Sequence, residues 1–239
     1  MDLIVTTQDL IRCGPPRRPR GLDWDQLPTR MIAAIRSSLG AHRPRAVRVG
    51  AVSGEEVVRT GDLRILLTGP PGSGKTTVLR RLIALLGTEG VRLGGFITEE
   101  FREGGHRAGF KVREIDGPSA VLARAGQPGS ARVGRYGVDI EAFESIALPA
   151  IDHAVEDAQV IVIDEIGRME LASVRFTARL DDVFALPRPV VATIHLAVHP
   201  VTDMLTRAPG TDVVHVSDGN RDHLPDQLSE RLLILLGRG

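Results

Sequence analysis

The sequence of 239 residues lacks the features that mark secreted or membrane-embedded proteins. Its single cysteine, Cys13, has no partner for an internal disulfide, which suits a reducing compartment. We find no run of the roughly 18 apolar residues that a membrane-spanning helix needs, and no sustained apolar segment near the N-terminus that would form a signal peptide. We therefore expect a soluble protein of the cytoplasm.

Net charge, aromatic residues and lysines are also scarce. The formal net charge is zero at pH 7, which gives no overall electrostatic case for binding nucleic acid or an anionic membrane. Aromatic residues make up 3% of the chain, so the core must be aliphatic. Of the 30 lysines and arginines, only Lys75 and Lys111 are lysines. A lysine offers a compact point charge, which invites a chemical reason for its use at position 75, whereas Lys111 has the plainer interpretation of a surface residue.

Residues 1–60 differ in composition from the rest of the chain. They hold ten arginines against six acidic residues, and the segment 13–21 is too rich in proline and glycine for regular structure. One helix is predicted at 26–40 and a loose hairpin at 45–60. We interpret 1–60 as an N-terminal extension of unknown role. Its basic stretch at 12–20 leaves contact with nucleic acid or a macromolecular partner open, although a solvated leader is the favoured interpretation.

From residue 61 to residue 239 the pattern is that of one α/β domain. Apolar segments typical of strands alternate with segments of helical periodicity, which predicts a mainly parallel sheet with helices on both faces. The predicted strands are 63–69, 94–100, 107–115, 158–167, 189–195 and 212–217. The predicted helices are 75–90, 140–158 with a kink or a second start at Pro149, 169–186, 200–207 and 220–236 with Asn220 as N-cap. The segment 116–138 is expected to be rich in loops.

A phosphate-binding motif lies between the first strand and the first helix of this domain. GPPGSGKT fits G-x-x-x-x-G-K-[ST] at every fixed position, with an apolar strand before it and an amphipathic helix after it. Its glycines allow successive N–H groups to turn inward around phosphate oxygens, and the helix N-terminus adds partial positive charge. Lys75 can reach the β- and γ-phosphates, the Thr76 hydroxyl can ligate Mg²⁺, and Thr77 is expected to help hold the α-phosphate. The motif predicts nucleotide binding by Gly69, Pro70, Pro71, Gly72, Ser73, Gly74, Lys75, Thr76 and Thr77.

Two adjacent carboxylates end a buried strand in VIVIDEIG. Asp164 falls where open α/β sheets bind ligands, so it can hold Mg²⁺ together with Thr76. Neighbouring strand residues point to opposite sides, so Glu165 is expected to serve a different purpose. A glutamate beside the metal ligand can orient or deprotonate a water in line with the γ-phosphate, which favours hydrolysis. Gly167 lets the chain leave the strand tightly.

With these motifs, the chain resembles the THEP-type nucleoside-triphosphatases, a family that includes the cancer-related nucleoside-triphosphatase and prokaryotic relatives. The resemblance covers about residues 63–236 and rests on blocks that occur in order. These blocks are TGPPGSGKTT (68–77), GGFITEE (94–100), RAGFKV (107–112), RVGRYGVDIEAFESIALP (132–149), VIDEIGRMEL (162–171) and NRDHLP (220–225).

Membership implies a Mg²⁺-dependent phosphohydrolase that accepts ATP, GTP, CTP and UTP. It also implies a RecA-like P-loop fold with another strand between the P-loop strand and the Asp164 strand. The family's acidic pair corresponds to Asp164 and Glu165, and its base-covering region to Asn220 and Arg221. Residues 1–60 depart from the family, which does not generally need such an extension.

Four further residues are weaker candidates. Arg135 is a candidate cation for the charge that develops on the transferred phosphoryl, or a surface arginine. Thr193 ends the strand expected next to Asp164, where it can sense the γ-phosphate, hold the attacking water or simply satisfy the strand end. Arg221 can cover the face of any base, and Asn220 can contact a base as well as cap a helix.

Two other functions remain open from the residues alone. The protein could be a kinase that transfers the γ-phosphate to a small acceptor or an RNA end, with Arg132 and Arg135 over the acceptor. It could also be a binding module switched by slow nucleotide hydrolysis, with residues 1–60 as the partner surface. Hydrolysis is the favoured function because of Glu165.

Overall fold

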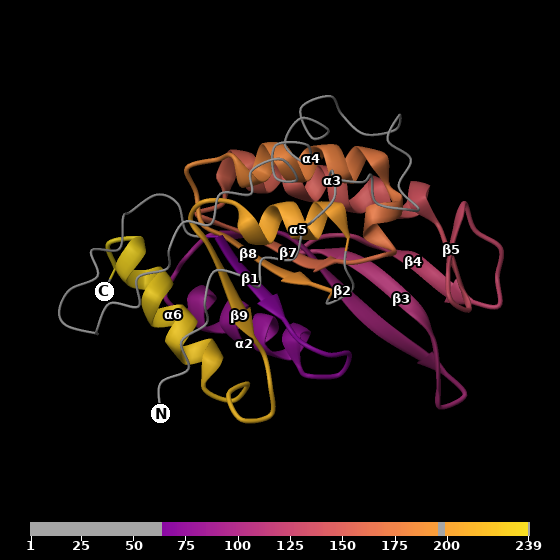
Figure 1. The fold of residues 1–239 in the computed structure, drawn as a ribbon, viewed down its shortest axis with the longest axis horizontal. Helices are drawn as coiled ribbons and strands as arrows, with labels where there is room; N and C mark the ends of the chain where they lie inside the picture. Colours follow the sequence, from indigo (N-terminus) through magenta and orange to yellow (C-terminus); the bar gives the residue numbers. More distant parts are fainter. Residues whose placement is uncertain (1–63, 196–198, 239) are drawn as a thin grey trace, which may run out of the picture. The chain divides into compact units, whose positions relative to one another are not determined.

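The computed structural model describes residues 64–195 and 199–238, which form a nine-stranded sheet with helices packed against it (Figure 1). The strand order is β5-β6-β4-β3-β2-β7-β8-β1-β9. The strands are β1 (Arg64–Thr68), β2 (Leu93–Glu103), β3 (His106–Glu114), β4 (Ser119–Ala125), β5 (Ala131–Val133), β6 (Tyr136–Val138), β7 (Val160–Ile166), β8 (Val190–Ile194) and β9 (Thr211–His215). The helices are α2 (Lys75–Thr88), α3 (Ile140–Asp157), the 3₁₀ turn η2 (Glu170–Ala172), α4 (Val174–Phe184), α5 (Pro200–Arg207) and α6 (Leu224–Leu235).

The half of the sheet that carries the phosphate motif is parallel. Strands β2, β7, β8, β1 and β9 pair in parallel, and every residue of β1 and β8 is buried. Strand β8 lies between β1 and β7, as the family resemblance implied. Since parallel strands end at the same edge, this order brings the P-loop, the end of β8 and Asp164 together. The predicted α/β fold is thereby confirmed.

The other half of the sheet is antiparallel. Strands β2, β3, β4, β6 and β5 pair in antiparallel fashion, so the sheet is mixed. The expectation that 116–138 is loop-rich was wrong, because this segment contains β4, β5 and β6. Strands β5 and β6 have three residues each, too few to show an alternating pattern, and they form because long-range pairing holds them.

Helices cover both faces of the sheet, with α2 and α6 on one side and α3 and α4 on the other (Figure 1). On the α2 and α6 side the core is aliphatic, with Leu82 and Leu232 among its buried members. On the opposite side, Phe96, Phe143 and Phe176 meet edge to face with ring centroids 5.2–5.7 Å apart. These three rings concentrate half of the six phenylalanines of the chain at the contact between β2, α3 and α4.

Three predicted helix boundaries need correction. No second helix starts at Pro149: α3 continues from Ile140 to Asp157, because its apolar face remains packed on the sheet although the proline removes one backbone donor, and the predicted kink stays a prediction. The predicted helix 169–186 is divided by Ser173, whose hydroxyl accepts from the Phe176 N–H and starts α4. The last helix begins at Leu224, and Asn220 is not its N-cap: its Oδ1 accepts from Ser217 N and closes a turn.

The predicted extension at 1–60, with its helix at 26–40, lies outside the described residues. Among residues 64–195 and 199–238, no helix is both long and apolar enough to span a bilayer.

Candidate active site

The phosphate motif folds into a tight loop between β1 and α2. Gly72 and Gly74 have φ values of +81° and +99°, in the region that favours glycine. Ser73 N donates to Pro70 O over 3.1 Å, and Val78 N donates to Gly74 O over 2.8 Å as the first bond of α2. The loop therefore leads directly into a helix N-terminus, which is the arrangement that binds phosphate.

The side chain of Lys75 folds back onto this loop. The residue is 9% exposed, and Nζ donates to Gly69 O over 3.1 Å and to Pro70 O over 3.4 Å. These carbonyl contacts hold the ammonium beside the loop amides, where a polyphosphate would lie.

Asp164, near the end of β7, is fully buried between two hydroxyl groups. Its Oδ1 accepts from Thr193 Oγ1 over 2.5 Å and from Thr76 Oγ1 over 3.3 Å. Its Oδ2 has no hydrogen-bond partner among the described residues. Burial raises the pKa of Asp164 to about 6, and the neighbouring charge of Glu165 adds to the rise, while the bonds from Thr193 and Thr76 oppose it.

This arrangement fits a magnesium ion. Mg²⁺ prefers hard oxygen ligands and is usually bound through one or two carboxylates, water and substrate phosphates. Among the described residues Asp164 Oδ2 has no partner, and the other oxygen of this carboxylate, Oδ1, accepts from the hydroxyl of Thr76 at the end of the phosphate loop. Thr76 and Asp164 are therefore the residues that would hold the metal, as the sequence predicts.

Glu165 occupies a different position from its neighbour. Asp164 is enclosed by the sheet, whereas the side chain of Glu165 lines an open cleft. The peptide bond between the two residues is cis. Burial raises the pKa of Glu165, and the positive charge of Lys75 opposes this. The two acids therefore have different surroundings, and their different roles stay a prediction.

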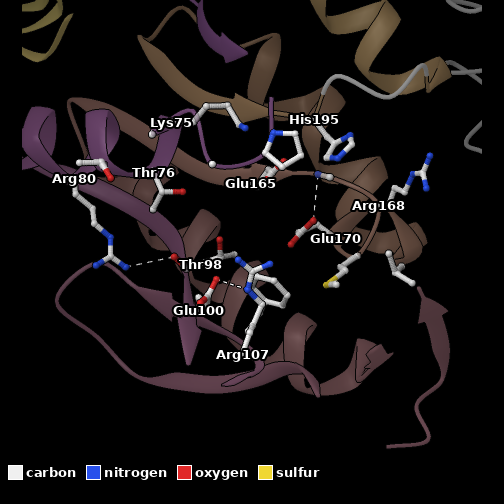
Figure 2. Close-up of a pocket in the computed structure, with 18 residues that line it drawn as sticks. Lys75, Thr76, Arg80, Thr98, Glu100, Arg107, Glu165, Arg168, Glu170 and His195 are labelled. Atoms are coloured by element: carbon white, nitrogen blue, oxygen red, sulfur yellow. Dashed lines mark hydrogen bonds and ion pairs between the residues drawn. The ribbon is translucent and has the colours of Figure 1, made fainter. Parts of the chain in front are cut away.

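The cleft has a volume of about 560 Å³ and extends from the phosphate loop to the antiparallel half of the sheet (Figure 2). Ten of its lining residues were not singled out as site residues from the sequence. These are Arg80, Thr98, Glu100, Arg107, Phe110, Val133, Arg168, Met169, Glu170 and His195. The signal was present in part, because GFITEE, RAGFKV and DEIGRMEL supply most of them.

Glu170 is the least expected of these residues. It is 5% exposed, and its Oε2 accepts from Gly167 N over 3.2 Å. Burial raises the pKa of Glu170 to about 8, and the negative charges of Glu165 and Asp164 raise it further. The sequence places Glu170 at the start of the predicted helix 169–186, where a glutamate is normally solvated, so the sequence gave no sign of this burial.

The weaker candidates lie at different distances from the cleft. Arg135 is not among its lining residues; one guanidinium nitrogen donates to Arg107 O over 2.9 Å and to Tyr136 OH over 3.2 Å. Thr193 is buried behind the cleft, where its hydroxyl holds Asp164. The catalytic roles of Arg135 and Thr193 stay predictions.

Asn220 and Arg221 follow β9 on the other side of the phosphate loop. Asn220 Nδ2 donates to His215 O over 2.7 Å, so its amide is engaged with the backbone of its own turn. The Cδ of Arg221 lies 3.4 Å from the position that a Cβ on Gly74 would take, which puts this side chain against the loop. Contact of both residues with a nucleobase stays a prediction.

A glycine-rich loop between a buried strand and a helix, with a carboxylate on the next strand but one, defines a P-loop nucleoside-triphosphate-binding protein. A family model described as NTPase matches residues 64–229. The chain belongs to this NTPase family, and the resemblance seen in the sequence is confirmed.

Relatives and solved structures agree with this assignment. The chain is 42% identical to nucleoside-triphosphatase THEP1 of Thermofilum pendens over 177 residues, which cover 72% of this chain and 97% of that protein. It is 38% identical over 173 residues to nucleoside-triphosphatase THEP1 of Thermotoga petrophila, covering 72% and 93% of the two chains. The crystal structure of THEP1 from Aquifex aeolicus superposes with a TM-score of 0.64 at 34% identity, covering 71% of this chain and 99% of that one. The solution structure of a human cancer-related nucleoside triphosphatase gives a TM-score of 0.62 at 34% identity, with coverage of 71% and 97%.

Proposed function

We propose that the protein hydrolyses ATP, GTP, CTP and UTP to the diphosphate and phosphate, with Mg²⁺ held by Thr76 and Asp164. The observation that carries this proposal is the division between the two adjacent acids. Asp164 is buried and hydrogen-bonded to Thr76 and Thr193, whereas Glu165 lines the cleft beside the phosphate loop. The relatives are named nucleoside-triphosphatases, which supports the same reaction.

The phosphate loop binds and orients the triphosphate. Its amides surround the phosphate oxygens, and the Lys75 ammonium exchanges the carbonyl oxygens of Gly69 and Pro70 for phosphate oxygens. When bound at Thr76 and Asp164, the metal supplies charge neutralisation at the phosphate oxygens.

Glu165 receives the proton of the attacking water. The water oxygen bonds to the γ-phosphorus while the bond from that phosphorus to the β–γ bridging oxygen breaks. One water proton passes to a carboxylate oxygen of Glu165, which is why this acid must face the cleft as an anion. The charge of Lys75 opposes the effect of burial on Glu165 and so favours this anionic form.

Tolerance for different bases follows from the type of contact available beside Gly74. Arg221 lies against the loop, and a guanidinium can cover the face of any base without reading its edge. Its engagement with Asp218 over 2.7 Å holds it near this position.

Phosphate release from each of the four triphosphates tests the proposal. We expect Glu165→Gln to retain nucleotide binding while its turnover falls by about 100-fold or more, the scale of a lost general base. Glu230→Gln, an exposed position on α6, is the matched control and should keep full turnover. Near-normal turnover of Glu165→Gln would rule out this role for Glu165.

Transfer to an acceptor other than water is the second candidate. The cleft continues past Glu165 to Thr98, Arg107 and Phe110, which leaves room for more than a water molecule. Arg132 and Arg135, which the sequence placed over an acceptor, do not line this cleft. Incubation with γ-labelled ATP and a pool of nucleosides, nucleoside monophosphates and RNA ends separates the two functions, because hydrolysis yields labelled free phosphate alone.

A further inference from the structure

Glu170 is a buried acid in the cleft that the reaction described above does not use. It is 5% exposed; burial raises its pKa, and the negative charges of Glu165 and Asp164 add to the rise. Its Oε2 accepts from the N–H of Gly167 over 3.2 Å. A buried acid without a cation is costly, so an apolar side chain would suit a purely structural position better.

The carboxyl groups of Glu165 and Glu170 meet at Gly167. A Cβ built on Gly167 would lie 3.0 Å from Glu170 Oε2 and 3.5 Å from Glu165 Cδ. The two acids therefore flank the same glycine, whose missing side chain leaves room for both. Figure 2 shows both labelled side chains at the same cleft.

Two carboxylates this close cannot both carry a charge easily. The charged groups around η2 come from the elements that pack against it: Asp164 and Glu165 on β7, Arg168 in the connecting loop, Glu144 on α3 and Arg175 on α4. Glu144 is already occupied, since it pairs with Arg175 and accepts from Ser173. Glu170 is the more buried of the two acids, and burial raises its pKa to about 8, whereas the charge of Lys75 opposes the effect of burial on the pKa of Glu165.

We propose that Glu170 is a positioning residue for hydrolysis: its carboxyl accepts the N–H of Gly167, holds the turn there and thereby fixes the direction of the Glu165 carboxylate. This inference rests on the proposed function of Glu165. Glu170 acts through Glu165 and the backbone, and it does not contact the reacting atoms.

Substitutions at position 170 test whether the reaction needs the hydrogen-bond acceptor of Glu170 or its ionisable group. Glu170→Gln keeps an uncharged acceptor for Gly167 N–H and is expected to retain kcat within about threefold. Glu170→Ala removes the anchor, and kcat is expected to fall about tenfold or more while KM stays within about twofold, because binding by the phosphate loop is untouched. A fluorescent triphosphate analogue measures binding, and far-UV circular dichroism verifies folding.

A double-mutant cycle with Glu165→Gln tests whether the two residues act together. If Glu170 works through Glu165, the variant Glu165→Gln/Glu170→Ala should turn over no more slowly than Glu165→Gln alone. Multiplicative losses would overturn the proposal, and so would a Glu170→Gln variant as slow as Glu170→Ala. Unchanged kcat in Glu170→Ala would overturn it as well.

Two further variants complete the design. Glu170→Leu fills the same buried space without a polar group. It replaces Glu170→Ala if the far-UV circular dichroism spectrum of the alanine variant shows that this variant does not fold. Glu230→Ala controls for loss of a glutamate at an exposed site. Failure of the proposed function would appear separately, as full turnover in Glu165→Gln, whatever the variants at position 170 do.

Discussion

Replacing Thr193 with valine removes one hydroxyl from the buried end of β8 with little change in shape. Thr193 and Asp164 are both fully buried, and the hydroxyl donates to Asp164 Oδ1 over 2.5 Å. Without it, the carboxylate retains the longer contact from Thr76 at 3.3 Å. Hydrogen bonds to charged groups contribute about 1.5–3 kcal/mol, so we expect the free energy of unfolding to fall by about 2–3 kcal/mol.

Urea denaturation followed by far-UV circular dichroism measures this loss. The experiment is run with a chelator and above pH 6, because the pKa of Asp164 is about 6 and the argument concerns its ionised form.

Thr177→Val is the matched control for this substitution. Thr177 is 3% exposed, and its hydroxyl donates over 2.9 Å to the neutral carbonyl of Ser173. Loss of a bond to a neutral acceptor should cost about 1 kcal/mol. Equal losses in the two variants would refute the reasoning, because they would show that the charge on Asp164 adds nothing to its bond with Thr193. A supporting result is a requirement for Mg²⁺ that rises about 10-fold or more in Thr193→Val alone, the usual effect of losing a group that orients a metal ligand.

Three further predictions concern the loop, the sheet and the buried acid. Lys75→Ala should weaken both nucleotide affinity and turnover, and unchanged affinity in an equilibrium titration would argue against the phosphate cradle. Gly95→Ala should destabilise the fold by more than about 2 kcal/mol, because φ is +113° and the new Cβ would lie 2.0 Å from Val162 O. Gly104→Ala, also at positive φ (+55°) but in open space, is its control and should cost about 1 kcal/mol in the same urea titration. Glu170→Gln should stabilise the metal-free protein increasingly as pH rises from 4.5 to about 8, by up to roughly 3–5 kcal/mol. Over that range the unfolded chain ionises at Glu170 while the folded chain keeps the proton, so the wild type loses stability and the glutamine variant does not; parallel urea titrations at both ends of the range check the difference.

The parallel half of the sheet could be predicted because its local pattern matches its environment. The segments that became β1 and β8 are short apolar runs, and a strand buried on both faces needs such a run. The phosphate loop could also be predicted from the sequence, since its glycines and Lys75 have fixed spacing. That spacing reflects backbone geometry within a few residues, which the sequence records directly.

The antiparallel half of the sheet could not be predicted from the sequence, because its strands depend on pairing with partners far along the chain. Strand β4 mixes buried Leu122 and Ala123 with half-buried residues such as Val121 and Arg124, and β5 is held by its pairing with β6. Cross-strand pairing stabilises such segments, and a local window contains only one member of each pair. For the same reason the sequence did not predict that Arg107 and Phe110 line the cleft, since they reach it only because β3 folds back beside β2.

The acids at the end of β7 and in η2 show which properties of a short segment can be predicted from its sequence and which cannot. The difference between Asp164 and Glu165 was inferred from adjacency alone, because two neighbouring carboxylates at a strand end cannot occupy the same place. Glu170 required the fold: its burial arises where η2 packs against α3, α4 and β7, and its nearness to Glu165 arises from the turn at Gly167. A sequence therefore states which groups are available for proton transfer, but burial decides which of them carries a charge. In this protein Glu165 is the one acid of the three that both faces the cleft and has its pKa held down by the charge of Lys75 against the effect of burial.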